Sequence, residues 1–562
     1  MSLRILPLGG LGEVGKNCLA LEAHGSVLVV DCGVSFDREK LGADVIHPDF
    51  RALERLAGNV IGLAITHGHE DHIGAIPHFL KHYDVPIYLP KHALELLRER
   101  EEEHEILQEA RFTLMETRTR TQIGPFEIEP IRVTHSTVDC TSLAIRVDGM
   151  VVLHTGDFKI DHEPTDEQHF DEARFREIGD EGISLLFSDS TNVDVDGPTP
   201  SERSTKASLL EAVGSAPRAV IIGLFASNVH RLRIAFEVAM ETDRKVVLLG
   251  RGMRTHASVA RRTGHLPWPD SLILPESRVR EADPKKLLFL ATGSQGEVRA
   301  ALGSLARDEH PVTKLEAGDR VVFSSRVIPG NELEVVALTD SLLRKGIEVL
   351  GRHYDRRLHV SGHAQREDQK TMLMLTRPRV FVPVHGTLHH LKKHAALAKE
   401  IGFEQSYVLE NGDLAELAKI ESSNADESER FALTILDRKP VPLGYASGSR
   451  RVDEAPRRTR RKLAENGVFF GTLDAQGRLR HLAQSGVFDE AREPRVMGDL
   501  ATHVSNALGA LRIDDENPRI RQEALLEAGR RAVRNFAKKR WGTRPEVELA
   551  VVEASSAHEL NG

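Results

Sequence analysis

The chain has 562 residues, a formal net charge of −9 and three cysteines, Cys18, Cys32 and Cys140. Its length predicts about two to four domains. So few scattered cysteines exclude a disulfide framework, and the lack of an apolar run of about 18 residues excludes a membrane-spanning helix. The opening residues MSLRILPLGG lack the sections of a secretory signal, so we expect a cytoplasmic protein with no membrane partner.

The first predicted element is a strand over residues 4–8, followed by the glycine-rich loop GGLGEVG. The glycines have the spacing of a dinucleotide-binding motif, which requires a helix opening at Gly12. Instead NCLALEAHGSVLVVD alternates, turns at residues 24–25 and runs as a second strand to Asp31. We therefore exclude a dinucleotide-binding fold and expect the glycines to let this loop pass close to a functional site.

The next apolar strand, predicted over residues 61–65, leads into the sequence THGHEDH. Loops at strand ends, held by a rigid scaffold, often carry catalytic groups. Neutral imidazole and carboxylate are suitable ligands for zinc-like or manganese-like ions. In this pattern the alternate side chains of His67 and His69 can converge on one point, while the adjacent pair Asp71 and His72 reaches another. The four candidate ligands are His67, His69, Asp71 and His72.

Four ligands in one loop indicate more than one ion, and the chain repeats the pattern of an apolar run ending in a polar residue. His135 ends such a run in IRVTHSTVDC, and Asp157 follows one in MVVLHTGDFK. His385 follows another in PRVFVPVHGT, and Asp31 ends the early strand GSVLVVD. Each occurrence alone is weak, but together they predict a metal centre.

A long gap separates Asp157 from His385. It contains the apolar runs AVIIGLFASN, KVVLLGRG, KLLFLATGSQGE and RVVFSSRVIPGNE, which end in glycine or small polar residues and alternate with helical stretches. This pattern predicts a parallel α/β domain over residues 204–356, inserted into a first domain that covers 1–203 and resumes over 357–420.

The polar segment 421–456, which contains ESSNADESE, predicts a linker. Residues 457–562 read as a small C-terminal α/β domain with a helix from about Pro518. Two basic stretches lie in this part of the chain, APRRTRRK and RRAVRNFAKKRWG. They are either solvated surfaces or RNA contacts, and the sequence favours neither interpretation.

The motifs THGHEDHIGAIP, THS, TGDFK, SDSTN, FASNVHR, TGSQGE, SSRVIPGNE, HVSGHA and PVHG resemble those of the metallo-β-lactamase superfamily. Within it, the chain is similar to the ribonuclease J family of the β-CASP nuclease branch. The resemblance reaches about residue 420 and continues more weakly beyond. It departs at HSTVDC, where the family pattern has proline and serine near Val138 and Cys140. The fold it implies is an αββα sandwich with an inserted β-CASP domain.

The resemblance also implies a centre of two divalent ions, which can generate a hydroxide and stabilise charge on a phosphorane. The implied ligands are His67, His69 and His135 for one ion, Asp71, His72 and His385 for the other, and Asp157 as a bridge, with Asp31 orienting a ligand. Zinc suits the histidine-rich set, and manganese or magnesium are alternatives. Some relatives also carry a structural calcium, for which Asp437 is the candidate here.

For catalysis, the family pattern implies that His363 protonates the leaving 3′-oxygen and that Asp189 orients His363, beside the ligands Asp71 and Asp157. The loops FASNVHR and HVSGH offer hydroxyl, amide and backbone N–H groups that cradle phosphate without reading bases. Alternatively, these two loops are simple turns at the ends of strands and bind no phosphate. The candidate phosphate-binding residues are Ser227, Asn228, His230, His359, Val360, Ser361, Gly362 and His363.

The function we expect is a metal-dependent ribonuclease that acts on single-stranded RNA with little base specificity. It would combine 5′-to-3′ exonuclease activity, preferring a 5′-monophosphate, with endonuclease activity in rRNA processing and mRNA decay. A homodimer or homotetramer formed through the C-terminal domain, with RNA-decay partners, is expected from the family. A DNA-directed β-CASP nuclease is an alternative, because no motif for a 2′-hydroxyl contact is visible. The inserted domain argues against a small-molecule hydrolase, and the intact ligands argue against a metal-free RNA-binding scaffold.

Overall fold

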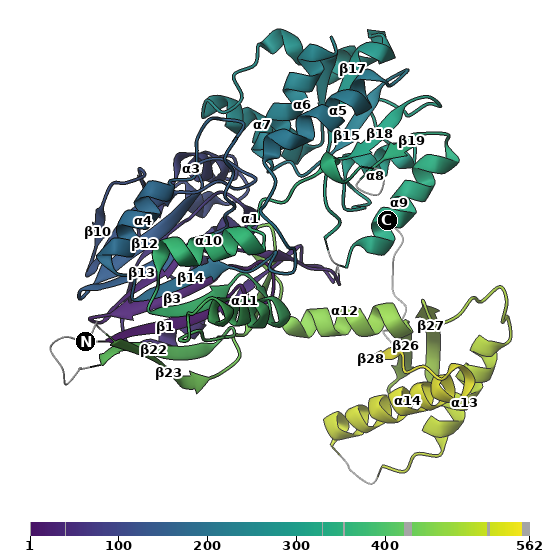
Figure 1. Cartoon of the computed structure of the whole chain (residues 1–562). Coiled ribbons are helices and arrows are strands. Elements are labelled where there is room, and N and C mark those ends of the chain that lie inside the picture. The colour runs from purple at the N-terminus through teal and green to yellow at the C-terminus, as the bar shows by residue number, and fades with distance from the viewer. Residues whose placement is uncertain are drawn as a thin grey trace. The chain divides into compact units, whose positions relative to one another are not determined.

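The computed structural model describes residues 2–39, 41–328, 330–351, 355–420, 430–513 and 517–552 (Figure 1). The chain divides into two compact units. One comprises Met1–Phe36 with Val45–Gly444, and the other Asp37–Asp44 with Tyr445–Gly562. The first unit carries every residue of the candidate site. Among the described helices, none is both long and apolar enough to cross a membrane.

The first unit is built on two mixed sheets. One has eight strands in the order β23-β22-β1-β3-β4-β7-β8-β9. Its strands are β1 Ser2–Gly9, β3 Cys18–Ala23, β4 Ser26–Val30, β7 Asn59–Ala64, β8 Ile87–Leu89, β9 Phe112–Leu114, β22 Asp413–Ile420 and β23 Arg430–Arg438. β3 and β4 form the hairpin predicted at residues 24–25, and no helix opens at Gly12.

The second sheet has six strands in the order β10-β11-β12-β13-β14-β20. They are β10 Thr121–Ile123, β11 Phe126–Arg132, β12 Thr141–Val147, β13 Met150–His154, β14 Leu185–Asp189 and β20 Val380–Val384. Apolar side chains of both sheets, such as Leu21 and Val152, share one buried core. Because burying this apolar surface is the main stabilising contribution, the two sheets pack face to face.

Helices cover the outer faces of both sheets. The core on the first sheet takes side chains from α2 Ile76–Phe79 and α3 Lys91–Arg98, with α1 Glu70–Ile73 beside them. The core on the second sheet takes them from α4 Glu172–Glu181, α10 Arg366–Thr376 and α11 Leu388–Glu400. This is the predicted αββα sandwich.

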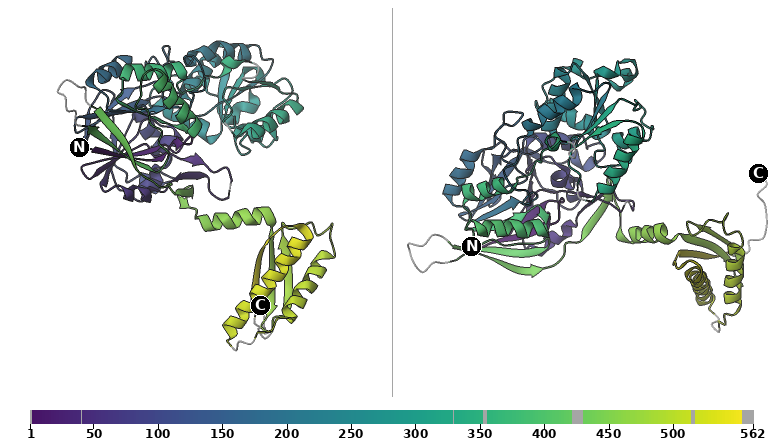
Figure 2. Two further views of the ribbon diagram at one scale, coloured as in Figure 1. Left: turned by 60° about the horizontal axis from the view of Figure 1, so that its bottom comes forward. Right: turned by 45° about the vertical axis from the view of Figure 1, so that its right-hand side comes forward.

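The inserted domain is a parallel sheet in the order β16-β17-β15-β18-β19, as predicted, with helices on both faces (Figure 2). Its strands are β15 Val220–Gly223, β16 Lys245–Leu249, β17 Leu287–Ala291, β18 Arg320–Phe323 and β19 Glu348–Leu350. α5 Thr205–Gly214, α6 Val229–Glu241 and α7 Arg251–Arg262 share one core, and α8 Ala301–Ala306 and α9 Glu332–Arg344 share the other.

A buried ion pair fastens the two points where the chain passes between sandwich and insert. Arg231 of α6 is fully buried and donates from Nε to Glu202 Oε1 at 2.9 Å. Its Nη1 donates to the carbonyl oxygen of Leu358 at 3.0 Å. Lys159 of the sandwich, also buried, lies 3.5 Å from Glu202 Oε2. Removing one partner would leave an uncompensated buried charge, which is strongly destabilising, so this network favours one seating of the insert.

The segment that departs from the family pattern, HSTVDC, joins the sandwich to the insert. Val138 is buried within a core of the inserted domain. Asp139 accepts a hydrogen bond from the backbone N–H of His92 at 3.2 Å and lies 3.2 Å from His265 Nε2. These contacts give the unusual residues a structural role at the junction, close to His135 in the sequence.

Part of the segment expected as a linker is a strand of the first unit. β23 pairs antiparallel with β22 and buries Phe431 and Leu433 in the core between the sheets. An edge strand buries only one face, so its apolar residues alternate with polar ones and the segment reads as polar overall. Residues 421–429 of the expected linker lie outside the described residues.

The second unit contains the sheet β27-β26-β28. Its elements are β26 Val468–Asp474, β27 Leu479–Ser485, β28 Glu546–Val552, α12 Glu454–Asn466, α13 Val496–Gly509 and α14 Pro518–Trp541. α13 and α14 share a core with the sheet, and α14 begins at Pro518 as predicted. Arg457 of α12 lies 3.9 Å over the ring of Tyr445 and pairs with Asp37.

Candidate metal centre

The candidate ligands are brought together because parallel strands end at one edge of the sandwich. β4 and β7 run parallel in one sheet, and β13, β14 and β20 run parallel in the other. The segments that follow their carboxyl ends carry Asp31, the 67–72 cluster, Asp157 and His385, and Asp71 and His72 of that cluster lie in α1. Asp189 is the last residue of β14. Side chains far apart in the sequence therefore meet in one buried site.

Three histidines and one carboxylate form the first half of the site. His69 Nδ1 lies 3.1 Å from His67 Nε2 and 3.2 Å from His135 Nε2. Asp157 Oδ2 lies 3.8 Å from His67 Nε2 and 3.6 Å from His135 Nε2. A tetrahedral ion bound at 2.0–2.1 Å separates its ligand atoms by roughly 3.3 Å, so these four groups fit one ion.

These imidazoles have the protonation state that an ion needs. Burial lowers the pKa of His67 and His135 well below the usual value, and neighbouring histidines lower it further. Burial likewise lowers the pKa of His69 to about 4. At neutral pH all three rings are therefore uncharged and present lone pairs to a cation.

The second half contains Asp71, His72 and His385 and shares Asp157 with the first. Asp157 Oδ2 lies 3.3 Å from His72 Nε2, and Asp157 Oδ1 lies 2.6 Å from His385 Nδ1. His385 Nε2 lies 3.4 Å from Asp71 Oδ2 and is a buried nitrogen without a hydrogen-bond partner among the described residues. An orphaned buried nitrogen facing a carboxylate fits a second cation.

Proton uptake distinguishes the two halves. Burial lowers the pKa of His72 and of His385, but nearby carboxylates, Asp157 foremost, outweigh it and hold both pKa values well above the usual range. Burial also raises the pKa of Asp157, whereas the surrounding histidines lower it more, so its pKa is well below the usual value. Cation binding at the second half must therefore displace protons from His72 and His385, which makes its affinity rise with pH.

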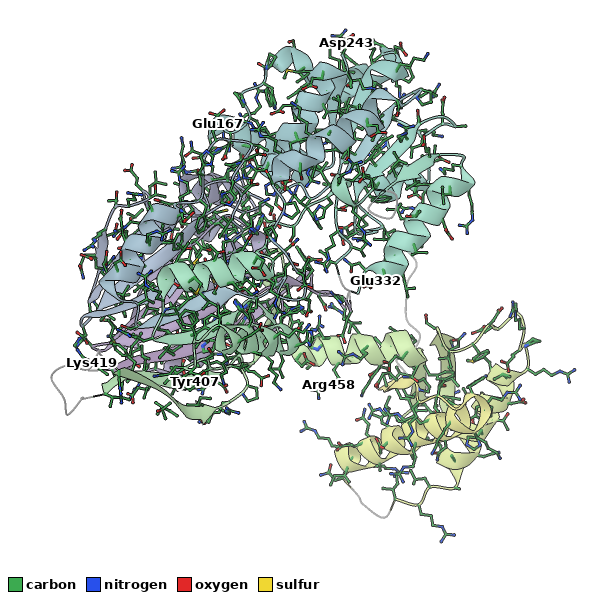
Figure 3. The ribbon with its side chains drawn as sticks, viewed as in Figure 1. Glu167, Asp243, Glu332, Tyr407, Lys419 and Arg458 are labelled. Carbon is green, nitrogen blue, oxygen red and sulfur yellow. The ribbon has the colours of Figure 1, made fainter. Side chains whose placement is uncertain are left out.

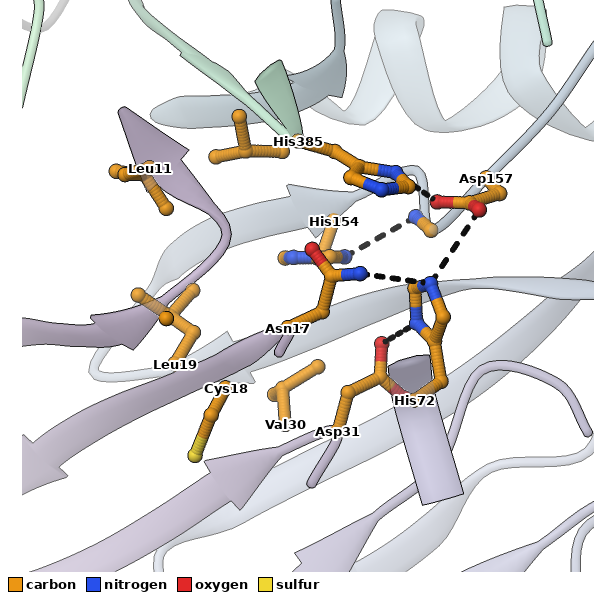
Figure 4. Close-up of a pocket in the computed structure, with 13 residues that line it drawn as sticks. Leu11, Asn17, Cys18, Leu19, Val30, Asp31, His72, His154, Asp157 and His385 are labelled. Atoms are coloured by element: carbon orange, nitrogen blue, oxygen red, sulfur yellow. Dashed lines mark hydrogen bonds and ion pairs between the residues drawn. The ribbon is translucent and has the colours of Figure 1, made fainter. Parts of the chain in front are cut away.

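Asp31 occupies the position expected of a residue that orients a ligand. Its Oδ2 accepts from His72 Nδ1 at 2.8 Å (Figure 4). Its Oδ1 accepts from the backbone N–H of Thr66 at 2.8 Å. Both Asp31 and His385 have positive φ angles, 58° and 52°. Such backbone strain persists where surrounding contacts impose it, and it occurs often at functional sites.

His363 and Asp189 form a hydrogen-bonded pair beside the centre. His363 Nδ1 lies 2.8 Å from Asp189 Oδ2, and Asp189 is fully buried at the end of β14. Burial lowers the pKa of His363, but Asp189 and Asp157 raise it more, so the net pKa is raised. Because Nδ1 is engaged by Asp189, Nε2 is the nitrogen left to exchange a proton with a substrate.

The candidate phosphate-binding residues separate into two groups. Gly362 and Ser361 lie at the centre, since the Gly362 carbonyl accepts from His135 Nδ1 at 2.7 Å and Ser361 Oγ accepts from Asn192 at 2.7 Å. Asn228 caps α6 by accepting from the backbone N–H of Arg231. His230 is buried and contacts Thr165 at 2.7 Å. The structure therefore gives Asn228 and His230 structural contacts, whereas 361–363 border the metal ligands.

His230 also lines a cavity of about 610 Å³ between sandwich and insert, to which Thr134 and Thr137 beside His135 contribute. The remaining candidates, Ser227, His359 and Val360, are half-buried or buried in the two loops. Asn17 and Asn192 also contact this region, although sequence reasoning did not single them out. Asn17 ends the glycine-rich loop and Asn192 belongs to SDSTN. Their place in these motifs is the only feature of the sequence that points to them.

The two basic stretches differ in their partners. In α12, Arg457 and Arg461 pair with Asp37 and Glu39 of the same unit, although Arg458 is exposed (Figure 3). In α14, Arg531 and Lys538 are exposed on one face of the helix. Both stretches therefore keep exposed basic residues, and part of the charge of α12 is paired within its own unit.

Asp437 has cationic neighbours instead of the oxygen ligands that calcium requires. Its Oδ2 lies 2.9 Å from Lys439 Nζ and 3.4 Å from Arg55 Nη2. The structure gives no support for a calcium ion at this residue.

Comparison with known proteins defines the class first. Residues 11–223 match the metallo-β-lactamase superfamily. Residues 217–342 match the β-CASP domain of ribonuclease J, and residues 353–408 match a Zn-dependent metallo-hydrolase RNA specificity domain. A protein of unknown function from Enterococcus faecalis V583 shares the fold, with a TM-score of 0.54 and 17% identity over 74% of this chain and 99% of its own. The fold is that of a β-CASP metallo-hydrolase, and the site contains histidine and carboxylate clusters that could hold metal ions.

The relatives then define the family. A Ribonuclease J of Sinorhizobium meliloti is 35% identical over 98% of this chain and 97% of its own length. A Ribonuclease J of Helicobacter pylori is 34% identical over 96% of this chain and 76% of its own length. A Ribonuclease J of a Synechocystis species is 42% identical over 74% of this chain and 66% of its own length. The chain belongs to the ribonuclease J family. Together with the site, this supports a metal-dependent ribonuclease.

Asp157→Ala should remove the carboxylate that the two halves share. We expect the protein to keep its far-UV circular dichroism but to bind metal at least about tenfold more weakly, because each half loses an anionic ligand. Metal content after dialysis, measured by mass spectrometry, checks this. Asp180→Ala, an exposed carboxylate paired with Arg377, is the control. Unchanged metal content in Asp157→Ala would contradict the shared-ligand assignment.

Proposed function

We propose that this protein is a two-metal ribonuclease that degrades single-stranded RNA from its 5′ end and also cuts internally. The observation that carries the proposal is the pair of ligand sets that meet at Asp157, with the His363–Asp189 pair beside them. One set is His67, His69 and His135, and the other is Asp71, His72 and His385. The donor atoms suit zinc or manganese, with magnesium as an alternative.

Ions bound there would acidify water and neutralise charge on the scissile phosphate. The chain's own contribution is to place and move protons. Asp189 holds His363 through Nδ1, which leaves the Nε2–H of His363 to protonate the departing 3′-oxygen. Asp31 fixes the ring of His72, and the carbonyl of Gly362 fixes the ring of His135. Because both imidazole rings are held in one orientation, the two halves of the site keep fixed positions relative to the reacting phosphate.

The substrate contacts that we assign are to the RNA backbone. Ser361 and the neighbouring backbone N–H groups offer neutral donors next to His363, and such groups bind phosphate without reading base edges. Sequence preference should therefore be slight. The expected roles are rRNA maturation and mRNA decay in the cytoplasm, together with RNA-decay partners. Relatives named Ribonuclease J support this assignment.

The His363–Asp189 pair should control the pH profile. Asp189 raises the pKa of His363, so the protonated ring survives to higher pH than it would alone. In Asp189→Asn that pKa falls, and the alkaline limb of the cleavage rate should move to lower pH. His363→Ala should lose about 10²- to 10⁴-fold in rate, with metal content unchanged. His389→Ala, an exposed histidine beside Asp194, is the control. An unmoved alkaline limb in Asp189→Asn would argue against His363 as the acid.

The state of the RNA 5′ end should decide the mode of attack. A 5′-monophosphate carries about −1.5 to −2 charge, which a pocket of neutral donors accepts. A 5′-triphosphate adds charge and bulk. RNA that carries it should therefore release single nucleotides slowly and be cut mainly at internal positions. Ser361→Ala should depress nucleotide release more than internal cleavage. Single-nucleotide release is measured from RNAs that differ only in a monophosphate, triphosphate or hydroxyl end, with a matched DNA. Equal rates on the first two would refute the pocket.

We also propose that the second unit assembles the protein into a dimer or tetramer, as the family resemblance implies. A chain ended after Gly444 keeps β23 and all candidate ligands but lacks most of that unit. Its mass in light scattering should fall to that of a monomer, and its RNA cleavage should weaken. An end after Ile420 is a poorer design, because it removes buried Phe431 and Leu433 from the core. A truncated chain that keeps the full-length oligomer would show that assembly lies elsewhere.

A further inference from the structure

The glycine-rich loop over residues 10–17 holds two parts of the second half-site at once. β2 Leu11–Gly12 pairs parallel with β21 Gly386–Thr387, directly after His385. At the other end of the loop, the backbone N–H of Asn17 donates to the carbonyl of Asp71 at 2.9 Å. A single loop therefore connects the segment of Asp71 and His72 with the segment of His385.

The side chain of Asn17 makes further contacts with the same half of the site. Its Nδ2 lies 2.9 Å from His72 Nε2 (Figure 4). It also donates to the carbonyl oxygen and to Oδ2 of Asp71, both at 3.2 Å. The carbonyl and carboxylate oxygens of Asp71 are acceptors only, so the amide atom that faces them is the nitrogen. Asn17 is buried, and its amide nitrogen contacts both Asp71 and His72, two residues of the same half of the site.

The glycines are required for this approach. A Cβ at Gly10 would lie 2.3 Å from Asn17 Oδ1, and one at Gly33 would lie 1.6 Å from the carbonyl oxygen of Asp71. Gly10 also has a φ of 85°, which side chains rarely adopt. Gly10 therefore leaves room for the Asn17 amide, and Gly33 leaves room for the Asp71 carbonyl that accepts from it. One glycine of a motif that fails as a dinucleotide site is thus explained by the position of Asn17.

We infer that Asn17 is a positioning residue for one half of the metal centre, the half formed by Asp71, His72 and His385. The inference rests on the two-ion centre proposed above. Within the described chain, no hydrogen bond joins residues 10–17 to His67, His69 or His135. Loss of the Asn17 amide should therefore weaken one ion and spare the other. Partners that orient ligands typically contribute 10- to 100-fold to metal affinity.

The test uses metal-stripped full-length protein titrated with manganese and followed by electron paramagnetic resonance, which counts bound ions and reports whether two ions are coupled. Wild type should bind two ions. Asn17→Leu, which has similar size but no amide, should bind the first ion normally and the second about 10- to 100-fold more weakly, with loss of the coupled signal. Val14→Ala, an exposed position in the same loop, should behave as wild type.

Each result has one reading. Two ions bound with wild-type affinities by Asn17→Leu would overturn the role of Asn17, and equal weakening of both ions would overturn its selectivity. Fewer than two ions in wild type would instead overturn the two-ion centre. If metal-free Asn17→Leu lacks the wild-type circular dichroism, Asn17→Ser decides, because its shorter hydroxyl donor should leave the second ion weakened and the first unchanged.

Discussion

The candidate metal centre depends above all on the buried carboxylate of Asp157. It lies within 4 Å of four histidines of the centre, His67, His72, His135 and His385. A carboxylate buried in this way is tolerated only when cations or hydrogen-bond donors compensate its charge. In the metal-free protein, protonated His72 and His385 supply that compensation, and cations would replace those protons. On binding cations, the centre would therefore exchange protons for metal around one fixed anion.

The packing of the two sheets against each other sets the distances between the candidate ligands. Ligand loops leave the carboxyl ends of strands from both sheets, so the relative position of the sheets sets the distances across the centre. The core between the sheets is apolar and closely packed, and packed cores resist small displacements. Asp31 and His385, which have positive φ angles, directly follow strands of the two sheets. Rigidity of the sandwich thus maintains ligand geometry before any cation is present.

The inserted domain contributes through its junction with the sandwich. Arg231 binds both Glu202 and the carbonyl of Leu358, which are the points where the chain leaves and re-enters the sandwich. The segment after Leu358 carries His363, so the buried ion pair and the proposed proton donor share one short stretch of chain. Val138 and Asp139 secure the same junction from the side of His135. Val138, one of the two positions that depart from the family pattern, therefore helps to fix the insert on the sandwich.

Much of this protein could be predicted from the sequence alone. The run THGHEDH, with His135, Asp157 and His385 after apolar strands, indicated a two-ion centre because ligand chemistry and strand ends are local properties. Alternating and apolar runs likewise predicted both α/β domains and the helix at Pro518. Tertiary structure alone decided the rest. β23 was hidden because an edge strand buries one face, and Asn228 and His230 proved to have structural partners. Asn17 contacts Asp71 only because two loops distant in sequence pack together, and no local pattern records such a contact.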